Sequence, residues 1–118
     1  MDAKLKELWL AALRSGEYPQ TMYTLKNSQG YCCLGVLCHV AAEANLLPAT
    51  LVVQEEPGQI VVKETREGFE EESNDQLPDG AFGIATLFMH RLMACNDGRF
   101  IYRQHSFEEI ADLIEKEA

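Results

Sequence analysis

The chain has 118 residues, of which 47% are hydrophobic and 25% are charged. These values are typical of a single folded domain and exclude a disordered chain. The formal net charge of −9 repels phosphates and argues against generic nucleic-acid binding. No apolar run reaches the roughly 18 residues that a membrane helix requires, and the N-terminus lacks the long apolar stretch of a secretory signal. We therefore expect no membrane association and a cytoplasmic location.

The first predicted element is an amphipathic helix over residues 2–14. Its apolar residues recur with the spacing of one helix face, and Asp2 is a suitable N-cap. Trp9 and Leu13 belong to that face. We therefore expect both side chains in the core.

A small hairpin and a second helix are predicted next. The β-type run over residues 22–25 precedes strong turn residues at 27–30, so Tyr31-Cys32 should return as a second short strand. The apolar pattern of residues 33–44 then predicts a helix. Asn45 follows it and can adopt the left-handed conformation that ends helices.

The middle of the chain combines β-branched runs with an acidic segment. The runs at 51–53 and 60–62 are separated by turn residues and predict a second hairpin. Residues 64–80 are polar and contain seven acidic residues between Glu64 and Asp79, so we expect an exposed, mobile loop. This loop either keeps the protein in solution or faces a basic protein partner.

Two further helices complete the expected fold. One begins at residue 82 or 84 and ends at Cys95. The other follows Ser106, which can form a capping box with Glu109. The sequence thus predicts one α+β domain over residues 1–118, in which about four helices pack with a small antiparallel sheet of one or two hairpins.

Several segments together carry a family resemblance. They are Trp-Leu-Ala-Ala-Leu-Arg-Ser-Gly-Glu-Tyr at 9–18, Tyr-Cys-Cys-Leu-Gly-Val-Leu-Cys at 31–38, Asn-Asp-Gly at 96–98 and Ser-Phe-Glu-Glu-Ile-Ala-Asp-Leu-Ile-Glu at 106–115. The chain resembles a family of small, uncharacterised proteins of tailed bacteriophages and prophages. The resemblance implies an accessory protein in a bacterial cytoplasm and assigns no catalytic residues. Residues 99–105 depart from the pattern of that family.

The four cysteines, Cys32, Cys33, Cys38 and Cys95, lack the paired C-x₂-C spacing of a zinc site. We therefore expect no metal, and we expect the thiols to be reduced and mostly buried. The alternative is a cysteine-dependent hydrolase. Cys32 or Cys33 at a helix N-terminus would be its nucleophile, and His105 would be its base. Neither a GxxxxGK[ST] nor a GxGxxG motif occurs, so no cofactor is predicted.

The segment from Arg99 to Ser106 is a candidate anion site. Arg99 and Arg103 could bind a phosphate, Tyr102 could stack on a base, and His105 and Ser106 lie at a helix N-terminus. The alternative is a short surface strand over residues 100–102.

These observations favour a non-catalytic binding protein that acts against a host process in a phage-infected cell. Its partner would be a host protein, inhibited through the acidic segment, or a small phosphorylated ligand, sequestered by the segment from Arg99 to Ser106. The sequence also allows a homo-oligomer.

Overall fold

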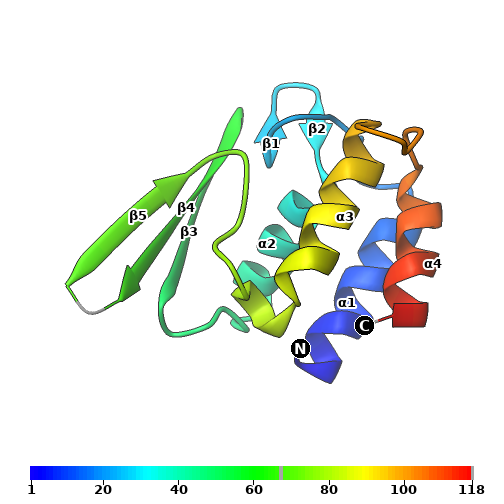
Figure 1. Cartoon of the computed structure of the whole chain (residues 1–118). Helices are drawn as coiled ribbons and strands as arrows, with labels where there is room; N and C mark the ends of the chain where they lie inside the picture. Colours follow the sequence, from blue (N-terminus) through cyan, green and yellow to red (C-terminus); the bar gives the residue numbers. More distant parts are fainter. Residues whose placement is uncertain (67, 118) are drawn as a thin grey trace.

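The computed structural model describes residues 1–66 and 68–117. The described residues form helices and two antiparallel sheets, and this confirms the predicted α+β class. The elements are α1 (Ala3–Arg14), β1 (Lys26–Asn27), β2 (Gly30–Tyr31), α2 (Cys33–Glu43), β3 (Leu51–Glu56), β4 (Gln59–Arg66), β5 (Phe69–Ser73), the short 3₁₀ helix η1 (Ala81–Gly83), α3 (Thr86–Asp97) and α4 (Phe107–Glu117). The helices pack together on one side, and the three-stranded sheet β3-β4-β5 stands at their flank (Figure 1). Within the described residues, no helix is both long and apolar enough to cross a membrane.

Helix α1 forms as predicted. Asp2 Oδ1 accepts a hydrogen bond from Leu5 N at 2.8 Å and so caps the helix. Trp9 and Leu13 are buried in the core, as expected. The indole nitrogen of Trp9 donates to Cys33 O at 2.9 Å, which links α1 to the first turn of α2.

The first hairpin is shorter than predicted. β1 pairs with β2, but residues 22–25 form bends, so the predicted strand there is wrong. Tyr23 has a φ of 67°, and its backbone N–H donates to Asp97 Oδ1 at 3.0 Å. A long-range contact thus holds this segment outside β geometry. Asn45, with a φ of 60°, does follow α2 in the left-handed conformation, as predicted.

The second hairpin, β3–β4, is confirmed, but the acidic segment is not the loop that the sequence predicted. Residues 64–66 complete β4, and residues 69–73 form a third strand, β5, with Val62 opposite Ser73 and Lys63 opposite Glu72. Backbone pairing with β4 orders the acidic residues although few apolar side chains accompany them. Glu67, which belongs to the predicted loop, lies outside the described residues.

The third helix begins later than predicted. Residues 81–83 form η1, in which Phe82 has a φ of 59°, and α3 therefore starts only at Thr86. It also continues two residues past Cys95 and ends at Asp97, with Gly98 left-handed. Helix α4 then follows Ser106 as expected.

Trp9→Ala should lower the free energy of unfolding by about 3–5 kcal/mol, because the indole is fully buried and bonded to Cys33 O. Urea denaturation monitored by circular dichroism measures the loss. Leu87→Ala, at an 83% exposed position on α3, is the control and should change stability by less than about 0.5 kcal/mol. Equal losses in both variants would contradict the placement of Trp9.

Candidate functional site

The cysteines lie in the interior and not in an exposed site. All four are buried, as expected. Cys32 is the N-cap of α2, and its Sγ accepts a bond from Gly35 N at 3.4 Å. Burial raises the pKa of Cys32 to about 12 and raises that of Cys33 well above its ordinary value. For both thiols, desolvation raises the pKa by more than the helix dipole lowers it. The raised pKa argues against Cys32 or Cys33 as the nucleophile of a hydrolase.

The predicted base of that hydrolase, His105, makes different contacts. Its Nδ1 lies 2.8 Å from Arg103 O, and its backbone N–H donates to Cys95 O at 2.8 Å. In the part of the chain that the structure describes, no three His, Cys, Asp or Glu side chains are grouped so that they could hold a metal ion.

A buried asparagine joins the end of α3 to the start of α2. Asn96 Oδ1 accepts from Cys33 N at 3.2 Å and from Gln20 Nε2 at 3.1 Å. Its Nδ2 donates to Thr21 O at 2.9 Å and to Asp97 Oδ1 at 3.0 Å. The Asn-Asp pair of the resemblance therefore acts as a structural joint.

Gly35 explains a further part of the cysteine-containing octapeptide. A Cβ at this position would lie 1.8 Å from Leu25 O, so only glycine allows the hairpin to approach α2 this closely. Cys32 N donates to the same carbonyl oxygen at 3.1 Å. The octapeptide is thus a packing motif at this contact.

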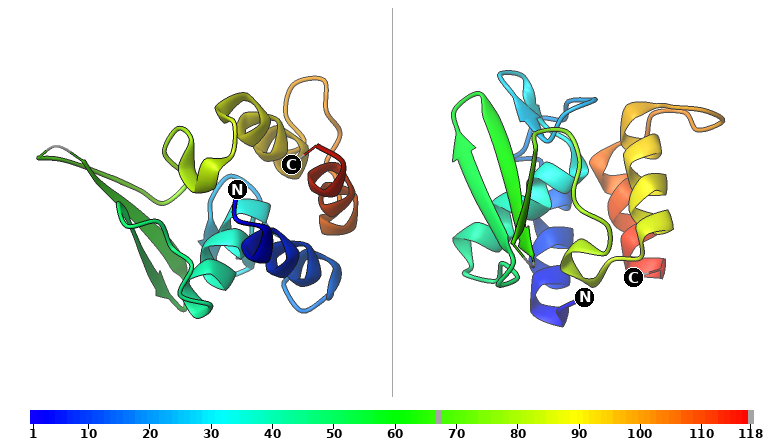
Figure 2. Two further views of the ribbon diagram at one scale, coloured as in Figure 1. Left: turned by 90° about the horizontal axis from the view of Figure 1, so that it is seen from below. Right: turned by 60° about the vertical axis from the view of Figure 1, so that its left-hand side comes forward.

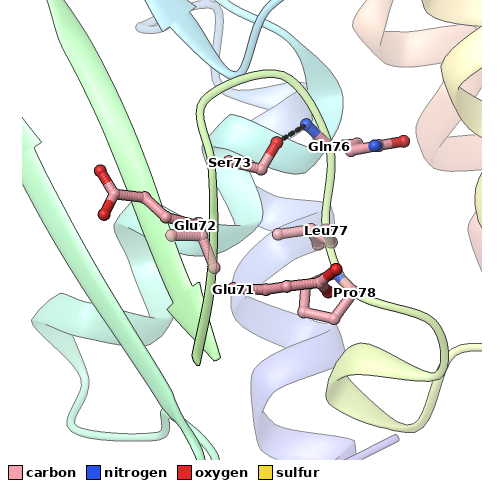
Figure 3. Close-up of a pocket in the computed structure, with 7 residues that line it drawn as sticks. Glu71, Glu72, Ser73, Gln76, Leu77 and Pro78 are labelled. Atoms are coloured by element: carbon pink, nitrogen blue, oxygen red, sulfur yellow. Dashed lines mark hydrogen bonds between the residues drawn. The ribbon is translucent and has the colours of Figure 1, made fainter. Parts of the chain in front are cut away.

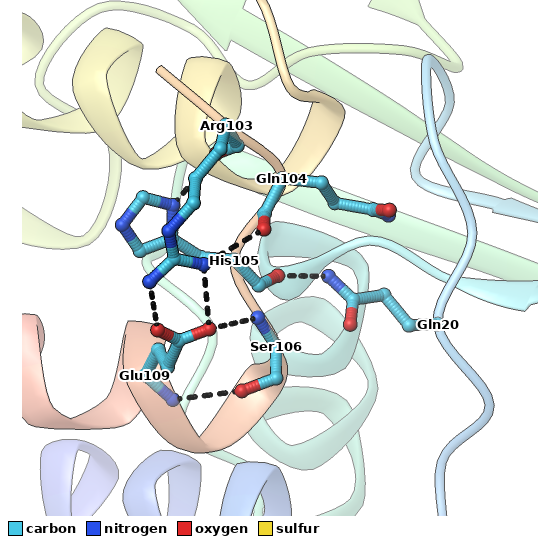
Figure 4. Close-up of polar contacts among 6 residues, drawn as sticks. All are labelled: Gln20, Arg103, Gln104, His105, Ser106 and Glu109. Atoms are coloured by element: carbon cyan, nitrogen blue, oxygen red, sulfur yellow. Dashed lines mark hydrogen bonds and ion pairs between the residues drawn. The ribbon is translucent and has the colours of Figure 1, made fainter.

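The loop of residues 99–105 is anchored at both ends. Arg99 N donates to Ala94 O at 3.0 Å, and His105 N donates to Cys95 O, so the two ends meet the last turn of α3. Gln20 Nε2 also donates to His105 O at 2.8 Å (Figure 4). The base of the loop is therefore fixed by backbone hydrogen bonds to α3 and by the side chain of Gln20.

The predicted anion-binding residues divide into two groups. Arg103, His105 and Ser106 lie together around Glu109 (Figure 4). Arg99 lies apart from these three residues. Its Nε is 3.3 Å from the buried carboxylate of Asp97, and its guanidinium carbon lies 4.7 Å from the centre of the Tyr23 ring.

Glu109 already occupies the positions that an anion would need. Its carboxylate accepts two bonds from the guanidinium of Arg103 and one from Ser106 N, while Glu109 N donates to Ser106 Oγ at 3.2 Å. This is the predicted capping box, here extended by an arginine. These bonds lower the pKa of Glu109 to about 2, first through Arg103 and then through Ser106. An anion at this helix terminus would have to displace the carboxylate of Glu109.

The tip of the loop carries two exposed apolar side chains. Phe100 is 90% exposed and Ile101 is 92% exposed. Phe100 has a φ of 59°, which is uncommon for a bulky residue, and Tyr102 N donates to Arg99 O at 3.0 Å to close the turn. The alternative surface strand over residues 100–102 is therefore wrong. The exposed tip was missed from the sequence, where two adjacent large apolar residues between arginines could have indicated it.

A second polar cluster, missed from the sequence, surrounds Glu55 of β3. Its carboxylate accepts from Lys26 Nζ at 2.8 Å and from Tyr31 Oη at 2.6 Å, and it lies 2.7 Å from His39 Nδ1. Burial alone would raise the pKa of Glu55, but bonds from these three groups hold it below its ordinary value. The ring of Tyr18 packs edge-on against those of Tyr31 and His39. This cluster attaches the sheet to the helices.

The acidic strand borders a shallow depression. A space of about 160 Å³ lies between β5 and residues 76–78, and the side chains of Glu71 and Glu72 project on either side of the strand (Figure 3). Ser73 Oγ accepts a bond from Gln76 N at 3.3 Å and holds the turn. The carboxylate of Glu71, on the side of Pro78, makes this depression unsuitable for an anionic ligand (Figure 3).

Asn96→Ala should lower the free energy of unfolding by about 1–3 kcal/mol for each buried group that loses its hydrogen bond. The most important of these groups is the backbone N–H of Cys33. Chemical denaturation measures this change. Asn96→Asp keeps the acceptor but loses the donor beside buried Asp97, so it should also destabilise. Wild-type stability in both variants would contradict a structural role.

The depressed pKa of Glu109 predicts a dependence of stability on acid. Because the folded-state pKa lies below the ordinary value of 4.5, the Glu109 contacts stabilise the fold above that pH and are lost as pH falls towards about 2. The thermal midpoint of wild type should therefore fall more steeply over this window than that of Glu109→Gln. Parallel curves for the two proteins would contradict the prediction.

Comparison with known proteins adds one finding. No curated protein and no solved structure matches this chain. A domain of unknown function, DUF8296, matches residues 1–48, the part that contains α1, the β1–β2 hairpin and α2. Over those residues, which include Gly35 and its octapeptide, the chain is similar to DUF8296.

Proposed function

We propose that this chain is a non-catalytic binding protein whose partner is another protein, bound through the loop of residues 99–105. The observation that carries the proposal is the exposure of Phe100 and Ile101, at 90% and 92%, on a loop with a fixed base. Removing each side chain from water would contribute roughly 1.5–3 kcal/mol. Because the loop is already ordered, little of that gain would be lost on binding.

The surroundings of the tip are typical of a protein interface. Arg99 and Arg103 flank the two apolar residues, and their charges are held in place by Asp97 and Glu109. Tyr23, which is 56% exposed, lies beneath the guanidinium of Arg99 and extends the surface. Aromatic residues and arginine are the side chains that most often dominate binding energy.

The resemblance to phage proteins supplies the context of the proposal. In that context the chain is an accessory protein that acts in the bacterial cytoplasm on a host protein, such as a component of a defence system. The acidic sheet lies on the far side of the molecule from the loop in each view (Figures 1 and 2). A partner held by the loop therefore does not depend on the acidic strand, whose role is to keep the complex in solution.

Sequestration of a small phosphorylated ligand is the competing proposal for the same segment. Arg103, His105 and Ser106 do lie together, but Glu109 already binds Arg103 and Ser106. This proposal predicts that Glu109→Gln, which weakens the internal competitor, binds nucleotides more tightly than wild type. Protein binding requires no such displacement.

A photo-crosslinking amino acid at position 100 should capture a single host protein in lysate from a susceptible bacterium, because Phe100 would lie inside the interface. The same group at Leu87 is the control, since that residue is 83% exposed but lies in the first turn of α3, whereas the loop follows its last turn. The adduct at position 100 should disappear when Ile101→Asp is added.

Mass spectrometry identifies the captured protein. Identical adducts from positions 100 and 87 would contradict the proposal, and so would an adduct that survives Ile101→Asp. Tight binding of a nucleotide by wild type, abolished in Arg103→Ala, would favour sequestration in its place.

A further inference from the structure

The imidazole of His39 lies between two carboxylates. Its Nδ1 is 2.7 Å from Glu55 Oε1 on β3, and its Nε2 is 2.7 Å from Glu43 Oε1, one turn further along α2. An ionised carboxylate only accepts hydrogen bonds, so each ring nitrogen needs a proton to make its contact. A neutral imidazole carries one N–H, whereas the imidazolium carries two. The geometry therefore fits the charged form of His39.

Two tyrosine rings pack against the imidazole. The ring of Tyr18, from the loop after α1, lies 5.5 Å from it between ring centres, and the ring of Tyr31 on β2 lies 5.7 Å from it. Both pack edge-on, and the His39 side chain is only 22% exposed. Rotating the imidazole away from a carboxylate would disturb both ring contacts. The ring is therefore held where both nitrogens face acids.

The two oxygens of Glu55 have different partners. Oε2 accepts hydrogen bonds from Lys26 Nζ on β1 and from Tyr31 Oη, whereas Oε1 contacts His39. With His39 charged, the cluster contains two cations, Lys26 and His39, and two carboxylates, Glu43 and Glu55. With His39 neutral, one negative charge is left uncompensated in it. The balance of charge in the cluster thus depends on a single proton.

We propose that protonation of His39 controls how firmly the three-stranded sheet is attached to the helices. Histidine is the side chain that ordinarily changes charge between pH 5 and 8. A neutral ring that keeps its proton on Nε2 leaves Glu55 Oε1 without the N–H of His39. A ring that keeps it on Nδ1 loses the attraction of opposite charges at Glu55 and turns a lone pair towards Glu43. Both tautomers weaken the link between α2 and β3.

The sign of the effect follows from which form the fold binds. The protonated ring makes both contacts, so the stabilisation is present at low pH and is lost as pH rises through the titration of His39. Burial raises the pKa of Tyr18 and of Tyr31, so both tyrosines keep their protons in this range. The effect of Glu109 lies below pH 4.5 and is therefore separate.

Three single variants test the inference. His39→Gln removes the titrating ring. Glu43→Gln, at a side chain that is 67% exposed, supplies an amide that can donate to the lone pair of a neutral ring, so both contacts of His39 survive the loss of its proton. Glu17→Gln is the matched control, because it removes the same charge from an exposed residue near Tyr18.

Thermal unfolding from about pH 5.5 to about pH 8, followed by circular dichroism, measures the link. Over this range the midpoint of wild type and of Glu17→Gln should fall by about 2–6 °C more than that of His39→Gln, with Glu43→Gln in between. His90 and His105 are present in all four proteins, so their titration cancels in the comparison.

Hydrogen exchange shows which part of the molecule loosens. After correction for the intrinsic effect of pH, exchange in residues 51–56 of β3 should accelerate more on raising the pH than exchange in residues 3–14 of α1. Nitrogen NMR of the folded protein at about pH 5.5 should show a proton on both ring nitrogens of His39.

A His39→Gln midpoint that falls as steeply as that of wild type would overturn the inference, and so would a Glu43→Gln midpoint that does. Exchange in β3 that only keeps pace with α1, or a neutral His39 ring at about pH 5.5, would also overturn it. The loop of residues 99–105 takes no part in these measurements, so their outcome leaves the proposed function to its own test.

Discussion

The close contact between the carbonyl of Leu25 and Gly35 is the constraint on which the other elements depend. It brings the β1–β2 hairpin against the first turn of α2, where a side chain of any size would collide with the backbone. The same turn receives the indole of Trp9 from α1 and the amide of Asn96 from α3. The hairpin, α1 and α3 are thereby positioned by polar contacts to the buried start of α2. The buried cysteines at this point serve as small apolar residues that fit the available space.

The sheet is attached differently. Its buried residues Leu51, Ile60 and Val62 contact the core, but its link to the hairpin and to α2 is the carboxylate of Glu55 with its three partners. The Glu55 side chain is 24% exposed, and the groups that contact its carboxylate come from three separate elements. The sheet is thus held by a polar cluster at one end, while its acidic end extends past the helices.

The parts of the fold that could be predicted from the sequence are those that depend on residues close together in the chain. The caps at Asp2 and Ser106 depend on residues three positions away, and both were identified correctly. β5 was missed because its acidic side chains resemble a loop, and its order comes from pairing with β4. The same distinction applies to the candidate site. Arg103, His105 and Ser106 are neighbours in sequence and do meet, whereas Arg99 contacts Tyr23, and the fold alone decides that contact. Exposure at Phe100 likewise depends on what the rest of the chain leaves uncovered.

The position of β5 at the edge of its sheet has a consequence for behaviour at high concentration. An edge strand offers unpaired backbone groups to any other strand, which is how many folded proteins begin to aggregate. Here the edge carries Glu70, Glu71 and Glu72 in succession. Two such edges that approached each other would bring six carboxylates together, at a cost in repulsion that backbone pairing would have to overcome. The acidic run thus opposes pairing between the β5 edges of neighbouring molecules.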